Sequence, residues 1–206
     1  MAQKKRASGA THVERPRLCV LAGGPCSGKT ALAEALARRG APTVPEAFTD
    51  LLDAGFDGRL LDIERFHFAI AEHQRVQEEQ ALARHPRRLI YCDRGLGDPL
   101  GYMLHHGHAP SRRLTELLRR SLYHYRLVFA LALNPSYRRT RRRPEPRAAA
   151  LRIQERIVQV YRQAGARLVW LPWGSLEWRA ERVLSLARRW ATLGSSSSSS
   201  SSWASS

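Results

Sequence analysis

Short apolar runs alternate with longer amphipathic stretches along most of the chain. Five of the runs are strand-like, because they are rich in leucine, valine and other apolar residues and are bounded by turn residues. These expected strands are Leu18–Ala22, Pro42–Val44, Leu89–Cys92, Leu127–Leu133 and Leu168–Leu171. Since segments with helical spacing separate them, the pattern predicts an α/β fold whose mainly parallel five-stranded sheet is covered by helices on both faces.

The stretches between the strands predict the covering helices. We expect these helices over Lys29–Arg39, near Leu61–Arg84, shortly after Asp98, and over Leu114–Tyr123, Arg147–Ala164 and Leu176–Leu193. Gly40 and Gly165 suit the position just past the end of a helix. The chain ends have a different composition, so we expect a flexible basic arm at 1–16, one folded domain at 17–193 and a disordered serine-rich tail at 194–206.

Composition narrows the class of protein. A chain of 206 residues that is 43% hydrophobic can build one full core. No apolar run approaches the roughly 20 residues that cross a bilayer, and the basic N-terminus lacks the apolar segment of a secretory signal. Three cysteines without paired spacing indicate a reducing compartment, so we expect a cytoplasmic protein.

The formal net charge of +16 comes almost entirely from arginine. Because these arginines are spread along the chain and do not alternate with aromatic residues in one stripe, a nucleic-acid partner is not favoured. An anionic membrane surface remains open as a partner.

The segment 23–30 combines glycines with one lysine and one threonine. It follows an apolar run, precedes a helical pattern and matches G-x-x-x-x-G-K-[ST], the P-loop or Walker A pattern. The expected nucleotide-binding residues are Gly23, Gly24, Pro25, Cys26, Ser27, Gly28, Lys29 and Thr30. Main-chain amides of such a loop surround a phosphate, the lysine reaches the β- and γ-phosphates, and the threonine hydroxyl ligates Mg²⁺.

Acidic residues stand at the ends of the second and third expected strands. Glu46 could take a proton from an attacking hydroxyl or hold a water on Mg²⁺, or it could simply open a helix near Ala47. Asp93 follows an apolar strand as a Walker B carboxylate does, which predicts a second ligand for Mg²⁺. Arg94 could grip a phosphate or an anionic substrate. Asp98 is expected either to cap a helix that begins at Pro99 or to contact the substrate.

Five arginines occupy six positions at 138–143, after the fourth expected strand. A run of like charges is usually a solvated surface. At this place it also suits a mobile lid that brings arginines onto the transferring phosphate. Arg139 is the expected nucleotide contact and Arg143 the expected catalytic residue of this lid.

Together, Gly-Gly-Pro-Cys-Ser-Gly-Lys-Thr at 23–30, Val-Pro-Glu-Ala at 44–47 and Asp-Arg-Gly-Leu-Gly-Asp at 93–98 resemble the AAA-type ATPase-like family of P-loop proteins. Its members are related to nicotinamide-riboside kinase domains and, more distantly, to deoxynucleoside and thymidylate kinases. The resemblance implies a three-layer, kinase-like P-loop fold that binds ATP or GTP with Mg²⁺. It also implies that Glu46 is the base or substrate-hydroxyl contact and that Arg94 binds substrate or phosphate.

Two functions are consistent with these features. The first is Mg²⁺-dependent transfer of the γ-phosphoryl group of ATP to a small hydroxyl-bearing, nucleoside-like acceptor by Lys29, Glu46, Asp93, Arg94 and Arg143. The second is a nucleotide-binding ATPase or GTPase switch that acts through a protein or lipid partner. ATP is favoured over GTP because the chain has no Asn-Lys-x-Asp guanine signature.

Overall fold

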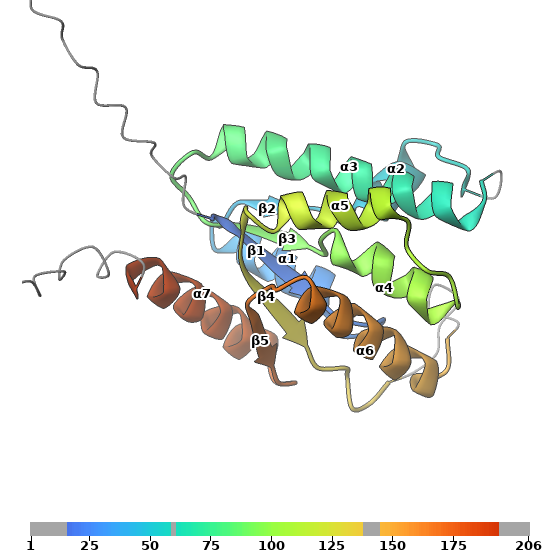
Figure 1. Cartoon of the computed structure of the whole chain (residues 1–206). Coiled ribbons are helices and arrows are strands. Elements are labelled where there is room, and N and C mark those ends of the chain that lie inside the picture. Colours follow the sequence, from blue (N-terminus) through green and yellow to red (C-terminus); the bar gives the residue numbers. More distant parts are fainter. Residues whose placement is uncertain (1–15, 59–60, 138–144, 194–206) are drawn as a thin grey trace, which may run out of the picture.

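A parallel β-sheet forms the centre of the protein (Figure 1). The computed structural model describes residues 16–58, 61–137 and 145–193. Within them the sheet has five strands in the order β2-β3-β1-β4-β5, and every neighbouring pair is parallel. The strands are β1 (Leu18–Ala22), β2 (Thr43–Val44), β3 (Ile90–Asp93), β4 (Tyr125–Leu131) and β5 (Leu168–Leu171). The predicted α/β fold with a five-stranded parallel sheet is therefore confirmed.

Helices fill the connections between the strands, as the pattern predicts, and one further helix follows the last strand. They are α1 (Lys29–Arg38), α2 (Ala47–Asp53), α3 (Ile63–Arg84), α4 (Gly97–His105), α5 (Arg112–Ser121), α6 (Arg147–Gln163) and α7 (Leu176–Leu193). Gly40 and Gly165 follow α1 and α6 with φ of 77° and 80°, which confirms them as the glycines that end these helices. The expected bounds of the fourth strand were two residues too late at both ends.

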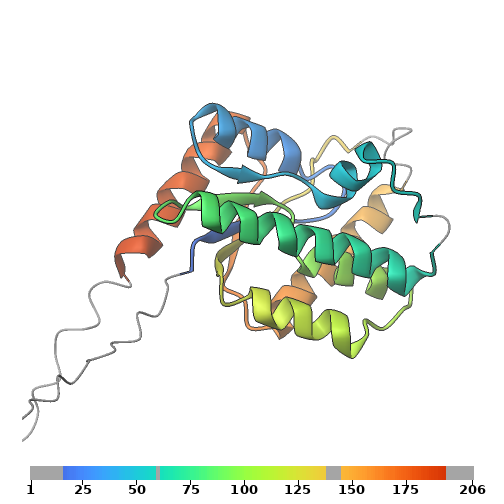
Figure 2. The same ribbon diagram turned by 90° about the horizontal axis from the view of Figure 1, so that it is seen from above.

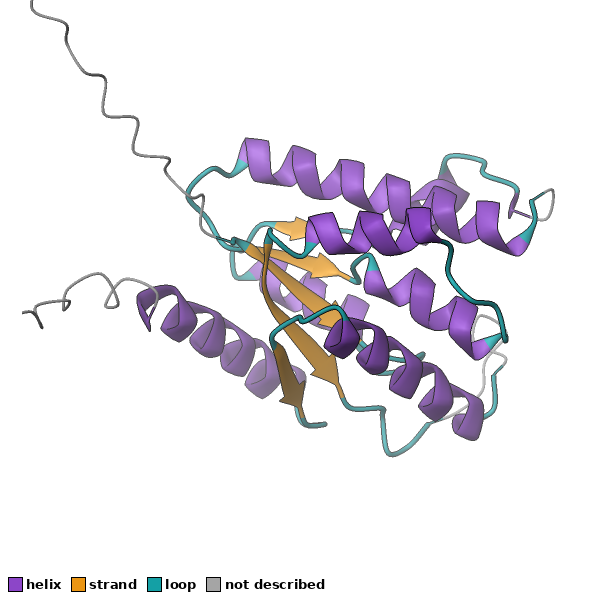
Figure 3. Cartoon of the chain, viewed as in Figure 1, coloured by secondary structure: helices purple, strands orange, loops and turns teal. Residues whose placement is uncertain are grey.

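Two apolar clusters separate the sheet from its two helical layers. Alternate residues of a strand point to opposite faces, so Leu18 and Val20 of β1 pack with α3, α4, α5 and α6, while Cys19 and Leu21 pack with α1 and α7. Figures 1 and 2 show these layers from two directions, and Figure 3 shows that helices cover both faces of the sheet. The result is the expected three-layer α/β/α arrangement.

The parallel topology brings three loops together at one edge of the sheet. The carboxyl ends of β2, β3 and β1 are neighbours, because these strands are adjacent in the sheet. Each of the three expected motifs follows one of these strands: 23–30 follows β1, Glu46 follows β2, and 93–98 spans the end of β3. Such an edge is where ligands bind in open α/β sheets. None of the described helices has the length and apolar character of a membrane-crossing segment.

Candidate active site

The loop between β1 and α1 has the backbone of a phosphate cradle. Gly23, Cys26 and Gly28 all have positive φ, at 147°, 59° and 78°. Gly28 is the N-cap of α1, and no side chain caps this helix start. The first amides of a helix have no partner within the helix, and the positive end of the helix dipole lies at the same place. The loop therefore offers backbone donors to an anion.

The glycines of this loop are also required by close packing. A Cβ at Gly24 would lie 2.6 Å from the carbonyl oxygen of Ala150 in α6. A Cβ at Gly23 would lie 3.0 Å from the carbonyl oxygen of Leu131 at the end of β4. Since both contacts are with backbone, larger residues would displace the loop or its neighbours.

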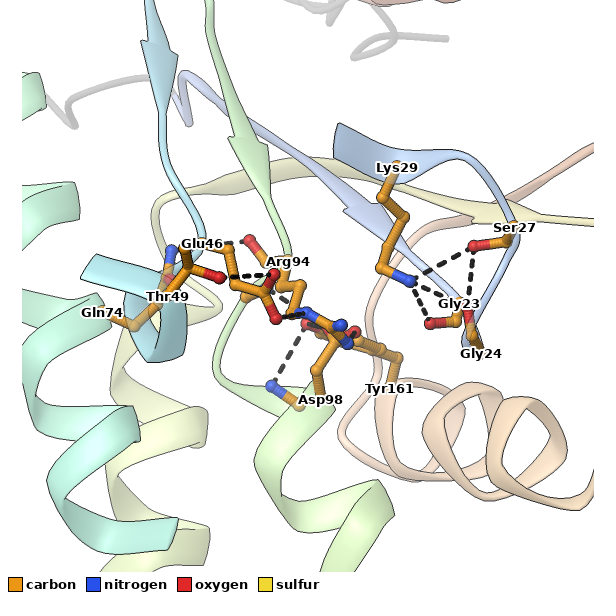
Figure 4. A network of polar contacts seen from close by, with 12 residues as sticks. Gly23, Gly24, Ser27, Lys29, Glu46, Thr49, Gln74, Arg94, Asp98 and Tyr161 are labelled. Atoms are coloured by element: carbon orange, nitrogen blue, oxygen red, sulfur yellow. Dashed lines mark hydrogen bonds and ion pairs between the residues drawn. The ribbon is translucent and has the colours of Figure 1, made fainter. Parts of the chain in front are cut away.

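Lys29 lies folded over the loop and is almost fully buried, with 5% of its surface exposed. Its Nζ donates to the carbonyl oxygens of Gly23 and Gly24 at 2.7 and 2.8 Å and to Ser27 Oγ at 3.2 Å (Figure 4). Burial, aided by repulsion from Arg94, lowers the pKa of Lys29 to about 7. All three hydrogen-bond acceptors of Lys29 are neutral oxygens of the loop. A bound phosphate would place a negative charge beside this side chain.

Asp93 ends β3 beside Leu21 of β1, which brings its carboxylate next to the P-loop strand. Burial raises the pKa of this carboxyl, while Lys29, Arg94 and a hydrogen bond from Thr30 oppose the rise. Its Oδ1 is buried without a hydrogen-bond partner. An unpartnered carboxylate oxygen beside a threonine hydroxyl fits the oxygen-ligand chemistry of Mg²⁺, so Thr30 and Asp93 are the residues that would hold the ion.

Arg94 forms ion pairs with two carboxylates. Its Nε lies 2.5 Å from Glu46 Oε1, and its Nη1 lies 3.8 Å from Asp98 Oδ1. The Arg94 backbone has a φ of 79°, which a residue with a Cβ adopts only at a cost of roughly 1–3 kcal/mol. Figure 4 shows Glu46, Arg94 and Asp98 gathered on one side of the site and Lys29 with the loop carbonyls on the other. The strained backbone of Arg94 is typical of a functional site.

Glu46 is both a helix cap residue and a member of the site. It is the N-cap of α2, as the alternative interpretation of the sequence had it, but its side chain caps no backbone amide. The carboxylate contacts Arg94 instead and accepts a hydrogen bond from Thr49 Oγ1 at 3.2 Å. The position therefore directs its carboxylate into the site.

The expectation that Asp98 caps a helix beginning at Pro99 is wrong. The helix α4 begins at Gly97, with Leu96 as its N-cap. Asp98 lies inside the first turn, and its Oδ2 accepts hydrogen bonds from the Gly95 amide at 3.3 Å and from Tyr161 Oη at 2.9 Å. The carboxylate reaches back to an amide before the helix, because a tyrosine from α6 and Arg94 hold it there.

A buried polar network supports the loop that carries Arg94 and Asp98. Tyr161 Oη also accepts a hydrogen bond from the Gly97 amide at 3.1 Å. Tyr125 Oη accepts from the Leu96 amide at 3.0 Å and donates to Glu78 Oε1 at 2.9 Å. The close approach of these tyrosines leaves no room for a Cβ at Gly95, which would lie 2.7 Å from Tyr161 Oη. The network therefore fixes the loop backbone.

Sequence reasoning assigned no role to Glu78, Tyr125 or Arg179. Glu78 and Tyr125 are far apart in sequence, and only the fold brings them together. Arg179 could have been noticed, because it lies at helical spacing between Leu176 and Val183 on the otherwise apolar face of α7. The lid arginines Arg139 and Arg143 lie outside the described residues, so their role stays a prediction.

Comparison with known proteins places the chain in a family. Residues 18–179 match the family described as AAA domain, and the chain belongs to that family. This confirms the resemblance drawn from the motifs at 23–30, 44–47 and 93–98. A search of curated proteins by sequence found no match.

Solved structures with a similar fold include two thymidylate kinases and the NadR protein. Thymidylate kinase from Ehrlichia chaffeensis has a TM-score of 0.60 at 12% identity, over 84% of this chain and 98% of that one. Thymidylate kinase from Candida albicans has a TM-score of 0.58 at 12% identity, over 85% and 92%. The NadR protein in complex with NR has a TM-score of 0.61 at 15% identity; the match covers 87% of this chain but only 53% of NadR. The fold therefore resembles that of these proteins, in agreement with the expected three-layer, kinase-like P-loop fold.

Proposed function

We propose that this protein binds ATP with Mg²⁺ and transfers the γ-phosphoryl group to the hydroxyl of a small, nucleoside-like acceptor. The observation that carries the proposal is that two parts of the site lie at adjacent strand ends. The first is the phosphate-binding loop with Lys29, and the second is the ion-paired cluster of Glu46, Arg94 and Asp98. Phosphoryl transfer depends mainly on positioning and charge stabilisation, and this arrangement offers both.

Each residue has a distinct role in this proposal. The amides of 23–30 and the Lys29 ammonium bind the β- and γ-phosphates. When bound between Thr30 and Asp93, Mg²⁺ would neutralise phosphate charge. Glu46 accepts the proton of the acceptor hydroxyl, and Arg94 orients Glu46 through their ion pair. Arg139 and Arg143, outside the described residues, are proposed to close on the phosphates as a lid.

The charges on the acceptor side favour an acceptor without a phosphate group. Arg94 has two carboxylate neighbours, Glu46 and Asp98, so its charge is already compensated. Burial alone would lower the pKa of Arg94, but nearby Tyr102, Glu46 and Asp98 raise it, so the guanidinium stays charged within this cluster. A further anionic group would meet two carboxylates there. An uncharged hydroxyl compound meets no such repulsion.

A labelled-phosphate assay tests the proposal. Purified protein is incubated with Mg²⁺, γ-labelled ATP and a panel of nucleosides and other small hydroxyl compounds, and products are scored for label. The proposal predicts fast turnover only when the right acceptor is present. Slow hydrolysis that no acceptor accelerates would favour the nucleotide switch instead, and neither transfer nor hydrolysis of ATP in any sample would contradict the proposed kinase.

A further inference from the structure

Arg179 of α7 lies buried against the outer side of the P-loop. Its Nη1 donates to the carbonyl oxygen of Ser27 at 2.9 Å. A Cβ at Gly28 would lie 3.0 Å from the same nitrogen, so the glycine makes room for the guanidinium. Only 2% of Arg179 is exposed, and its Cζ lies 5.1 Å from the centroid of the Trp173 ring that packs on it. The arginine therefore belongs to the immediate surroundings of the loop.

The Arg179 guanidinium has no anionic partner among the described residues. Its Nε and Nη2 are buried and make no hydrogen bond. The residues outside the description contain a single acidic side chain, Glu14 in the basic N-terminal segment. Burial lowers the pKa of Arg179 to about 10. Taking a charge out of water without a partner is expensive, and buried charges are ordinarily paired.

The position of Arg179 beside the P-loop indicates which kind of anion could balance its charge. The Ser27 carbonyl that it holds directly precedes Gly28, the N-cap of α1. Lys29 holds the carbonyls of Gly23 and Gly24 in the same loop. The loop thus lies between two buried basic side chains whose hydrogen bonds all go to neutral oxygens. The uncapped start of α1 offers backbone donors to an anion at the same place.

We propose that Arg179 is a positioning residue of the nucleotide site, which holds the P-loop through Ser27 and is charge-compensated by the phosphate chain of the bound nucleotide. The inference rests on the proposed nucleotide binding and adds a residue to it. Arg179 acts through the loop: its hydrogen bond fixes the backbone at the start of α1, and its charge raises the positive potential felt by the phosphates. The effect should grow with the negative charge of the ligand.

A purely structural role of Arg179 and a role in nucleotide binding predict different stabilities for R179M without ligand. If Arg179 only held a carbonyl in place, its loss would destabilise the fold, and all ligands would bind more weakly by the same factor. If it is an uncompensated cation kept for the nucleotide, an apolar side chain of similar length leaves the free protein as stable or more stable. Stability without ligand and affinity with ligand therefore separate the two roles.

The experiment compares R179M and R179K with the wild type. Thermal unfolding is measured without nucleotide, and the Kd values of fluorescently labelled ATP and ADP are measured with Mg²⁺ at fixed ionic strength. We expect R179M to weaken ATP binding by about 10- to 100-fold, to weaken ADP binding less, and to leave the Tm of the free protein unchanged or higher. R179K should retain most of the affinity. R182M, at an exposed position of the same helix, is the matched control and should change neither quantity.

Other results would overturn the inference in recognisable ways. Wild-type affinity for ATP in R179M would show that the charge is not used. An R179M protein that fails to fold, or that has a lowered Tm with equal losses for ATP and ADP, would show a structural role only. If the wild type itself binds no nucleotide, the proposed function fails, and this inference fails with it.

Discussion

The site has two halves, a phosphate half around the loop 23–30 and an acceptor half around Arg94. Their basic side chains have different partners. In the phosphate half, Lys29 and Arg179 donate only to neutral backbone and hydroxyl oxygens of the loop. In the acceptor half, Arg94 lies between the carboxylates of Glu46 and Asp98. The two halves lie side by side at one edge of the sheet, yet only in the second does a basic side chain form ion pairs with carboxylates. In the proposed function, this difference assigns the first half to the triphosphate and the second half to an uncharged acceptor.

The two halves also differ in what holds them in shape. The phosphate loop is shaped by its own backbone, with positive φ at Gly23, Cys26 and Gly28. The loop of the acceptor half is held from outside by two buried tyrosine hydroxyls, Tyr125 from β4 and Tyr161 from α6. Changes to the loop residues and to Arg179, which holds the loop from α7, should therefore damage the first half. Changes to the two tyrosines of β4 and α6 should damage the second.

The largest effect is expected when the phosphate half loses Lys29. We expect Lys29→Ala to weaken ATP binding by about 100-fold or more and to bring turnover below detection, because the side chain proposed to bind the β- and γ-phosphates is removed. Isothermal titration with ATP and Mg²⁺ measures the affinity. Arg38→Ala, on the exposed side of the same helix, is the control. Normal ATP affinity in the lysine variant would contradict the assignment of the loop.

A selective loss is expected when the acceptor half loses its base. Glu46→Gln keeps the size of the side chain but removes the proton acceptor, so phosphoryl transfer should fall by about 100-fold or more. ATP affinity should stay within a factor of a few, because Glu46 lies on the other side of the site. Glu34→Gln on the surface of α1 serves as the control. Unchanged turnover in the Glu46 variant would remove this residue from the mechanism.

The external support of the acceptor half is tested with Tyr161→Phe. The variant leaves Asp98 Oδ2 without one hydrogen bond and the Gly97 amide without its acceptor. Loss of these buried partners should lower the free energy of unfolding by about 1–3 kcal/mol. Urea denaturation measures it, with Tyr123→Phe as the control because this tyrosine is 68% exposed. A stability equal to that of the control would mean that the hydroxyl supports nothing.

A smaller effect, on pH dependence, is expected from Glu78 beneath the same loop. Burial raises the pKa of Glu78 from 4.5 to about 8, while hydrogen bonds from Gln74 and Tyr125 oppose the rise. Between these values the native state binds more protons than the unfolded state, so the stability due to Glu78 is lost as pH rises from 4.5 towards 8. Glu78→Gln resembles the protonated acid and should flatten this slope in urea denaturation at pH 5, 6.5 and 8. Glu181→Gln, at an exposed position of α7, should leave the slope as it is.

The sequence was most informative where structure is local. The P-loop could be predicted because its glycines, its lysine and the flanking strand and helix are contiguous. Asp93 could be placed for the same reason, since it ends a short apolar strand. The helix α2 was considered only as an alternative, because Ala47–Asp53 spans just seven residues, about two helical turns.

Features that depend on tertiary contacts could not be read from the sequence. Local capping rules suggested that Asp98 precedes its helix, but Tyr161 and Arg94 hold the carboxylate inside the first turn. The network of Glu78 and Tyr125 joins residues of α3 and β4 that no spacing rule connects. Arg179 also acquires its meaning only when α7 packs against the loop.

The comparison between the halves is tested most directly by one transfer experiment. An acceptor phosphorylated by the wild type is offered beside its own monophosphate, each with γ-labelled ATP and Mg²⁺, and the labelled products are separated and counted. We predict transfer to the uncharged hydroxyl compound and a turnover on the monophosphate that is at least about 100-fold lower, since the carboxylates around Arg94 repel a second anion. Preferred phosphorylation of the monophosphate would contradict the account.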